Sequence, residues 1–397
     1  MGSPIRRRRR KDERGQGILE YGLIAGAVAL VVIAVLQLVG GNSKNALCAT
    51  TNGVTPLTCV TGTTQVAASG ATFTGFGAGQ MSLRSMTVDT NSKIWFAEYP
   101  SQKVGVLDPV SGQQTTISLP NDGPAGLIAG PSATVYVTLQ QPDPNRIIQL
   151  NESGNIIGGP WTIPNTGATP AGAGDGVMGS DGNIWFTEFS VAKIGMLNIS
   201  TGVVTNYSVQ TNGTNVVQLS NGPDGNVWFT DNCANKVGNI TPSGVITEWS
   251  IPAGFAAAAA PDCNGQVHYT GSTSYPVGIV LGPDKSLYVV VRTSNQIMRV
   301  VPNGGLAPTM TSLATIPTPF PSSNATRITV GPDANLWFTE WTASKVGRVS
   351  LGDQSVTEWQ APTGFDCLES IVTAGRNVYY ADPCADTIGH MQTPLGT

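Results

Sequence analysis

The chain has 397 residues, only 12% of them charged, with 48 glycines and 27 prolines. The first 15 residues carry seven Arg or Lys and two acids, so the rest has 14 basic and 23 acidic residues. An acidic body without a basic patch argues against a nucleic-acid partner. Many glycines and prolines with few charges are typical of short strands joined by tight turns. No Walker loop, Gly-x-Ser-x-Gly, His-Glu-x-x-His or EF-hand run occurs, and no cofactor is expected.

A basic leader, residues 1–15, precedes an uncharged run that one acid interrupts. The leader ends at Gly15, and the run from Gln16 to Val39 is apolar apart from Glu20. As a helix these residues would extend about 36 Å, enough to cross a bilayer. We therefore predict a hydrophobic helix over residues 16–41, and the basic leader predicts a cytoplasmic amino terminus.

Glu20 is the most informative residue of this run. A carboxylate inside lipid costs about 2–3 kcal/mol or more, and ionisable groups there usually have a charged partner and a function. Gly22 and Gly26 form a small-xxx-small step that lets helix backbones approach closely, although such steps are common in apolar helices. A cleaved signal peptide would have a shorter apolar region and a small-x-small cleavage site. A plain single-pass anchor stays an alternative.

The order of basic leader, Gly15, four residues, Glu20, Tyr21 and apolar helix resembles the Flp (Tad, type IVb) pilins, over about a tenth of the chain. The resemblance implies that a prepilin peptidase cuts between Gly15 and Gln16. It also implies that Glu20 meets the new amino terminus of a neighbouring subunit as a filament grows. A carboxylate and an ammonium, both poorly solvated, relieve each other's desolvation when they pair.

Residues 42–70 are rich in Thr, Asn, Gly, Ala and Ser, and we interpret them as a connector. The six cysteines form no C-x-x-C and only two histidines exist, which argues against zinc. An even number of cysteines after an export-type segment favours disulfides, and fifteen sets of pairings can be drawn. Free buried cysteines are the alternative. Proximity in sequence favours Cys48 with Cys59, Cys233 with Cys263, and Cys367 with Cys384.

From about residue 80 the sequence repeats itself seven times. Each copy has an apolar strand, a turn of Gly-Pro-Asp type, an aromatic strand, a third strand and a fourth. Four antiparallel strands about every 45 residues are typical of a propeller blade. The predicted fold is mainly β, a seven-bladed β-propeller over residues 71–397. The aromatic anchors are Trp95, Tyr136, Trp185, Trp228, Tyr288, Trp337 and Tyr379.

The seventh copy ends after its third strand, near Met391, which would leave an open strand edge. We predict that Gly70–Phe76 supplies the missing strand and closes the ring. In four copies an acid at the end of the aromatic strand is followed five residues later by a lysine, which predicts a cross-hairpin ion pair, worth about 0.2–1 kcal/mol if it is exposed. The pairs are Glu98 and Lys103, Glu188 and Lys193, Asp231 and Lys236, and Glu340 and Lys345.

The blade texture, Gly-Pro-Asp-Gly-Asn-x-Trp-Phe-Thr-Glu followed by Lys-(Ile/Val)-Gly-Arg, resembles the virginiamycin B (streptogramin) lyase family of seven-bladed propellers. The resemblance implies ring opening of a cyclic ester by elimination, with histidine and glutamate around a magnesium ion. The only two histidines here are His268 and His390. Neither lies in a Pro-His or His-Ala context, and neither lies beside an innermost strand. We therefore expect no catalytic residue, no metal and no enzyme activity.

Taken together, the two resemblances predict a pilin. Its helix would form the core of an extracellular filament on a prokaryotic cell surface, a homopolymer built by pilus assembly machinery. Before assembly the subunit would lie in the inner membrane. The propeller would be displayed outside, with adhesion to an unidentified surface ligand as a second role. The alternative is a membrane-anchored, lyase-like or ligand-binding propeller that does not polymerise.

Overall fold

The chain divides into two units, Met1–Cys59 and Val60–Thr397, and every residue described below belongs to the second. The predicted helix Gln16–Val39 therefore lies outside the described residues. The computed structural model describes residues 64–66, 72–77, 83–99, 101–119, 123–140, 145–164, 172–188, 191–210, 215–255, 275–317 and 323–393.

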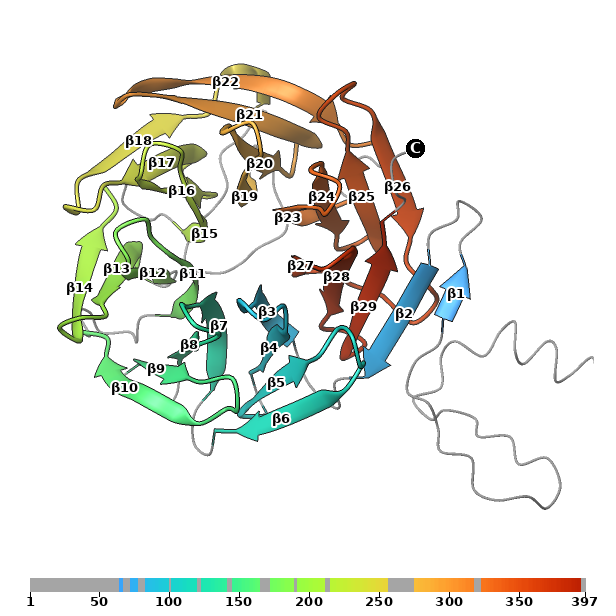
Figure 1. Cartoon of the computed structure of the whole chain (residues 1–397). Helices are drawn as coiled ribbons and strands as arrows, with labels where there is room; N and C mark the ends of the chain where they lie inside the picture. Colours follow the sequence, from blue (N-terminus) through green and yellow to red (C-terminus); the bar gives the residue numbers. More distant parts are fainter. Residues whose placement is uncertain are drawn as a thin grey trace, which may run out of the picture. The chain divides into compact units, whose positions relative to one another are not determined.

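The described strands form seven antiparallel sheets arranged as the blades of a propeller, as predicted (Figure 1). In each of the first six blades, four strands follow one another in chain order from the axis to the rim. The strands of blades 1–3 are β3 (Leu83–Val88), β4 (Ile94–Glu98), β5 (Lys103–Leu107), β6 (Gln114–Ser118); β7 (Pro124–Ala129), β8 (Val135–Leu139), β9 (Arg146–Leu150), β10 (Ile156–Thr162); and β11 (Ala173–Met178), β12 (Ile184–Glu188), β13 (Lys193–Asn198), β14 (Val203–Ser208).

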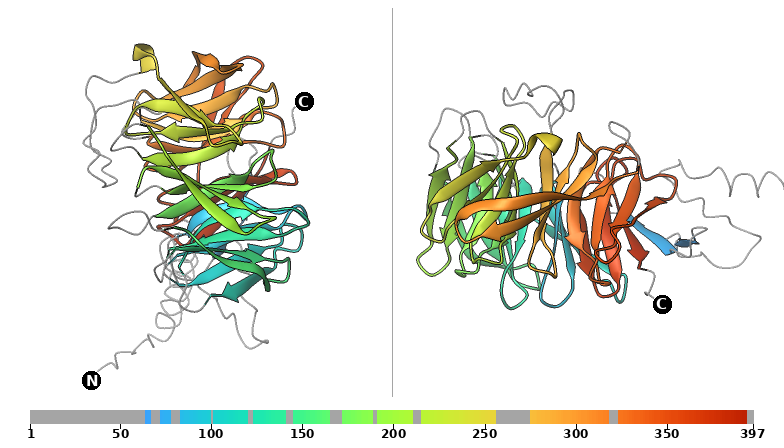
Figure 2. Two further views of the ribbon diagram at one scale, coloured as in Figure 1. Left: turned by 90° about the vertical axis from the view of Figure 1, so that its left-hand side faces the viewer. Right: turned by 90° about the horizontal axis from the view of Figure 1, so that it is seen from above.

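Blades 4–6 repeat this order. Seen edge-on in Figure 2, the long β21–β22 hairpin of blade 5 (orange) runs along the outer side of the ring. The strands are β15 (Val216–Asn221), β16 (Val227–Asp231), β17 (Lys236–Ile240), β18 (Ile246–Ser250); β19 (Pro276–Leu281), β20 (Leu287–Val291), β21 (Gln296–Asn303), β22 (Leu306–Thr315); and β23 (Ala325–Val330), β24 (Leu336–Glu340), β25 (Lys345–Val349), β26 (Val356–Gln360).

Blade 7 joins the two ends of the described chain. Its inner strands are β27 (Ile371–Ala374), β28 (Asn377–Asp382) and β29 (Thr387–Gln392). Strand β2 (Thr72–Gly77) pairs with β29 through five residue pairs and supplies the fourth strand, beside the red β29 in Figure 1. The segment predicted for this role was Gly70–Phe76. A short β1 (Thr64–Val66) then pairs with β2 as a fifth strand that was not predicted.

The one helix among the described residues is the short 3-10 turn η2, Ala253–Phe255. No helix in this part of the chain has the length and apolar character needed to cross a bilayer.

In five of the seven blades the turn before the aromatic strand has a structural role that its sequence did not reveal. An Asp in the turn accepts a hydrogen bond, 2.8–3.2 Å long, from the ring N–H or O–H of the aromatic residue on the second strand. The acid fixes the orientation of a ring that would otherwise bury an unpaired donor. The pairs are Asp89 with Trp95, Asp181 with Trp185, Asp224 with Trp228, Asp284 with Tyr288, and Asp333 with Trp337.

The glycine in the third strand is explained by a contact within the same blade. In blade 6 the ring of Phe338 covers Gly347, and a Cβ atom added there would lie 2.0 Å from the ring. Gly105 and Phe96, in blade 1, show the same arrangement. Only glycine leaves room for the ring, so these blades pack the second strand tightly against the third.

Candidate functional site

The inner strands surround a cavity of about 130 Å³ on the propeller axis. Six of the seven blades contribute residues to it. It is lined by Met86, Thr87, Leu127, Asp175, Gly176, Val177, Gln218, Leu219, Arg327, Ser370 and Ile371.

A β-bulge near the start of the inner strand is common to blades 1–6. Bulges re-aim side chains and are frequent next to functional sites. The third residue of these strands lies at the bulge, and in blades 3, 4 and 6 it is Asp175, Gln218 and Arg327. The bulge therefore brings one polar side chain from each of these three blades to the cavity.

Asp175 and Arg327 meet across the axis although 152 residues separate them. A guanidinium nitrogen of Arg327 donates to Asp175 Oδ2 at 3.4 Å. Strong charge-assisted bonds of this kind are about 2.7–2.9 Å long, so the contact is a loose one. The Asp175 and Arg327 side chains remain 24% and 16% exposed, so solvent reaches both.

Asp175 is not fully compensated by this contact. Its Oδ1 is buried and makes no hydrogen bond within the described part of the chain. Burial raises the pKa of Asp175 above its ordinary value, although Arg327 and the Ser85 hydroxyl oppose this effect. A partly desolvated carboxylate in this state favours an additional cationic or hydrogen-bond-donating neighbour.

The remaining polar groups at the axis tie neighbouring blades together. The Ser85 hydroxyl in blade 1 accepts a hydrogen bond from the Leu127 N–H in blade 2, at 3.1 Å. The Gln218 side-chain oxygen in blade 4 accepts one from the Ile279 N–H in blade 5, at 3.3 Å. These bonds fix the positions of the blades around Asp175 and Arg327.

A second set of polar groups lies at the ends of the second strands. The four predicted acid–lysine pairs face each other in register across β4–β5, β12–β13, β16–β17 and β24–β25. The acids are at most 2% exposed, so the small energy of an exposed ion pair does not apply to them. The acids are Glu98, Glu188, Asp231 and Glu340.

Burial is the main cause of raised pKa values in this set. It raises the pKa of Glu188 to about 7 and that of Asp231 to about 6. Burial, reinforced by the nearby Glu358 carboxylate, raises the pKa of Glu340 to about 8. In blade 6 the Lys345 ammonium forms its 2.7 Å ion pair with Glu358 on the outer strand. Because such acids recur in several blades, they are a property of the fold and not a single active site.

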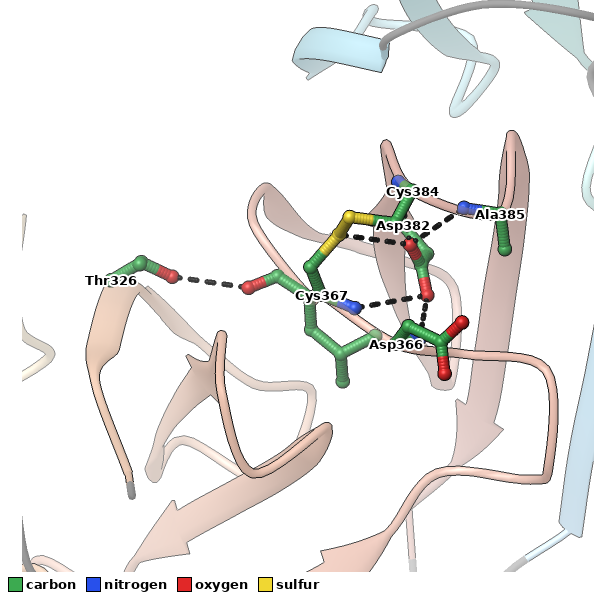
Figure 3. Close-up of a disulfide and its surroundings, with 7 residues drawn as sticks. Thr326, Asp366, Cys367, Asp382, Cys384 and Ala385 are labelled. Carbon is green, nitrogen blue, oxygen red and sulfur yellow. Dashed lines mark hydrogen bonds between the residues drawn. A yellow bond between two sulfur atoms is a disulfide. The ribbon is translucent and has the colours of Figure 1, made fainter. Parts of the chain in front are cut away.

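The disulfide Cys367–Cys384 joins the segment before β27 to the turn after β28 (Figure 3). It is one of the three pairings that sequence proximity favoured. Beside it, the buried Asp382 carboxylate accepts hydrogen bonds from the backbone N–H groups of Asp366, Cys367, Cys384 and Ala385. Cys233 is also disulfide-bonded. The other cysteines of the predicted pairings, Cys48, Cys59 and Cys263, lie outside the described residues.

His390, the one histidine among the described residues, does not line the axial cavity. His390 lies on β29, the third strand of blade 7, where its ring is 5.2 Å from that of Tyr379 and burial lowers its pKa. His268 lies outside the described residues. So do the residues predicted for processing and filament assembly, which are Gly15, Gln16, Glu20, Tyr21, Gly22 and Gly26.

The described residues do not fit the magnesium ion that the lyase resemblance implies. Magnesium takes oxygen ligands in near-octahedral geometry, whereas Asp175 is the one carboxylate among the described residues that line the axial cavity, and it lies beside the Arg327 cation. The cluster of Cys367, Asp382 and Cys384 has the spacing of a metal site. Its sulfurs are joined in a disulfide and its carboxylate is occupied by backbone donors.

Sequence reasoning missed Asp175 and Arg327. A signal was present, because aligning the inner strands puts Ala-Gly-Asp-Gly-Val-Met beside Ala-Thr-Arg-Ile-Thr-Val, with opposite charges at the third position. The repeats were compared on their aromatic strands, whose acids recur. A charge that occurs in one blade only is the better indicator of a site.

Comparison with known proteins identifies the type of propeller. The virginiamycin B lyase family model matches residues 58–270, more than half of the chain. The structure of the virginiamycin B lyase from Staphylococcus aureus superposes with a TM-score of 0.67 at 26% identity, covering 82% of this chain and all of that one. A catalytically inactive His-to-Ala variant of that lyase, solved with quinupristin, matches at 27% identity with a TM-score of 0.66.

More distant similarity is limited to the fold. Hydrazine synthase from Kuenenia stuttgartiensis matches with a TM-score of 0.60 at 11% identity, covering 80% of this chain and 97% of that one. No curated protein matches the chain.

Proposed function

Because the chain belongs to the virginiamycin B lyase family, we propose that it uses that family's propeller without its chemistry, as the displayed domain of a pilin-type subunit. The observation that carries the proposal is Glu20, a single carboxylate in the apolar run that follows a basic leader and Gly15. An acid inside a membrane segment is costly, and pairing with a cation lowers this cost. The amino terminus of a neighbouring subunit, freed by cleavage after Gly15, would provide one.

The chemistry at the axis supports a non-catalytic propeller. Elimination needs a general base within reach of the substrate proton, and the inactive variant of the Staphylococcus aureus lyase lacks a histidine side chain. No histidine lines the axial cavity among the described residues of this chain. Asp175 is the one carboxylate there, and it is paired with Arg327.

The closure of the ring supports display. The described chain begins at β1 and β2, which are the outermost strands of blade 7. A segment that precedes them is thus joined to the rim of the propeller. The chain therefore enters the propeller at the outer strands of blade 7, and these strands are separate from the inner strands that surround the axial cavity.

The pilin half is tested with Glu20→Ala in the producing cell, with Glu152→Ala, an exposed propeller acid, as the control. We expect Glu20→Ala to abolish surface fibres seen by electron microscopy and the control to keep them. Protein from sheared fibres should begin at Gln16. Fibres that survive Glu20→Ala, or secreted protein that begins at Met1 or beyond Gly40, would contradict the proposal.

A lyase is the second candidate, favoured by 26% identity over the full length of the Staphylococcus aureus enzyme. The purified chain would be incubated with quinupristin and magnesium, and ring opening followed by chromatography. We expect no turnover above a boiled-protein control. Turnover that is lost in His268→Ala would instead establish catalysis and overturn the non-catalytic half of the proposal, while leaving the test of Glu20 unaffected.

A further inference from the structure

We propose that the axial cavity binds a small zwitterion, an α-amino acid of about the size of glycine, alanine or serine. The cavity contains one acidic and one basic side chain, Asp175 and Arg327, on inner strands of blades 3 and 6. A ligand that carries both an ammonium and a carboxylate matches this pair without leaving a net charge buried. The inference concerns a ligand and is independent of filament formation.

The pair itself is incompletely coordinated. The single contact between Arg327 and Asp175 is 3.4 Å long, and Asp175 Oδ1 has no hydrogen-bond partner in the described part of the chain. A guanidinium presents five N–H donors and prefers a bidentate carboxylate. Arg327 can therefore bind a ligand carboxylate, and a ligand ammonium can donate to Asp175 Oδ2, which is held by the long contact with Arg327 alone among the hydrogen bonds of the described residues.

The walls of the cavity favour a ligand with little or no side chain. The volume of about 130 Å³ is well below the 300–1,000 Å³ of typical drug-sized pockets. Leu127 and Ile371 provide an apolar part of the lining, and Thr87 and Ser370 provide hydroxyl groups. A methyl or hydroxymethyl side chain is compatible with this lining, whereas a leucine side chain exceeds the room.

The site is also pre-organised and accessible. Gln218, which lines the cavity, is held by the Ile279 N–H of the next blade, so one wall is fixed by a contact between blades. The Asp175 and Arg327 side chains are partly solvent-exposed, so a small solute reaches them without unfolding. A rigid site lowers the entropic cost of binding.

Isothermal titration calorimetry of the full-length protein in detergent tests the proposal with a panel of solutes. We expect saturable binding of glycine, alanine or serine at one site per chain, and at least tenfold weaker binding of acetate, methylammonium and leucine. If acetate binds as tightly as glycine, the cavity recognises an anion and not the ammonium group of an amino acid. No saturable heat for any amino acid up to 10 mM, roughly the millimolar range expected for so few contacts, would show that the cavity holds water only. Either result overturns the proposal.

Variants locate the site. Asp175→Asn should weaken glycine binding at least tenfold, whereas Asp353→Asn, which removes the same charge from an exposed turn, should leave it unchanged. If Asp175→Asn does not fold, the double variant Asp175→Asn, Arg327→Gln removes both charges together and serves the same purpose. Unchanged binding in whichever of these variants folds contradicts the assignment.

Discussion

At the scale of single residues, the buried carboxyl groups at the ends of the second strands set how the propeller responds to pH. Glu340 is fully buried and faces Lys345 across the hairpin, with the carboxyl of Glu358 nearby. Burial raises its pKa from the ordinary 4.5 to about 8. The folded protein therefore keeps a proton on Glu340 that the unfolded chain releases near pH 4.5.

The sign of the pH dependence follows from this difference. Because the folded state binds more protons between pH 4.5 and 8, stability is greatest in mild acid and falls as the pH rises. The slope is about 1.4 kcal/mol per pH unit for each such group. Glu188 and Asp231 add to it up to about pH 7 and pH 6.

We predict that Glu340→Gln flattens this dependence. Glutamine keeps the shape of the neutral acid and cannot ionise. The free energy of unfolding of the variant, relative to that of wild type, should therefore increase as the pH rises from 5 to 8. Urea unfolding at a series of pH values measures the free energy of unfolding. Glu152→Gln, on an exposed acid, serves as the control and should follow wild type. Parallel pH profiles for Glu340→Gln and wild type would show that Glu340 is ionised in the folded state.

At the scale of strands, the glycine of the third strand and the aromatic ring of the second form one packing unit. Gly347 lies under Phe338, and Gly352, in the following turn, has no such neighbour. Added volume in a packed interior forces side chains from their preferred rotamers or shifts the backbone, at a cost of about 1–3 kcal/mol.

Gly347→Ala should therefore lower the free energy of unfolding by about 1–3 kcal/mol or more, while Gly352→Ala changes it by less than about 0.5 kcal/mol. Chemical denaturation of the two variants beside wild type measures both values. Equal effects at the two positions would mean that the Phe338 ring moves aside at little cost.

The disulfide of blade 7 gives a second prediction at this scale. Cys367 and Cys384 are 17 residues apart, and closing a loop of this length restricts the unfolded chain by about 3 kcal/mol. The free energy of unfolding of the double variant Cys367→Ala, Cys384→Ala should be lower by about that amount, while its content of β-strands stays unchanged. Chemical denaturation and circular dichroism measure the two quantities. Adding a reducing agent to wild type should cause the same loss, and adding it to the double variant should cause little further loss. An equal loss in the double variant would mean that another disulfide is responsible.

The strand pattern and the closing strand could be predicted from the sequence because both follow from the residues of a single repeat. Trp337, the Gly-Pro-Asp turn and the Lys345 that follows recur at fixed spacing, and a last copy without a fourth strand requires one from elsewhere. The pairing of Asp175 with Arg327 could not be read in this way. It depends on a bulge that aims each side chain at the axis and on the width of the closed ring, which joins residues 152 positions apart. The burial of Glu340 could not be read from the aromatic strand either, because Ser323 and Glu358, which lie close to its carboxyl, come from other parts of the same blade.

At the scale of the whole molecule, the ring depends on β2. Without it, β29 would expose an unpaired edge, and the seven sheets would no longer form a closed circle. The unit boundary at Val60 lies before β1, so a chain that begins there keeps both outer strands.

A chain that begins at residue 60 should fold and melt as cooperatively as the propeller of the full-length protein. A chain that begins at residue 78 should melt at a lower temperature and aggregate. Scanning calorimetry and size-exclusion chromatography of the two truncations measure this difference. Identical melting of the two would show that blade 7 is stable with three strands.

The position of β1 and β2 also has a mechanical consequence. Tension on the chain preceding Thr64 reaches the ring first through the three residue pairs of β1 and then through the five pairs that hold β2 to β29. The shorter ladder yields before the longer one, so a stretched subunit lengthens in two steps while the other six blades keep their shape. The two strands that complete blade 7 would thus also let the subunit extend under force before the rest of the propeller unfolds.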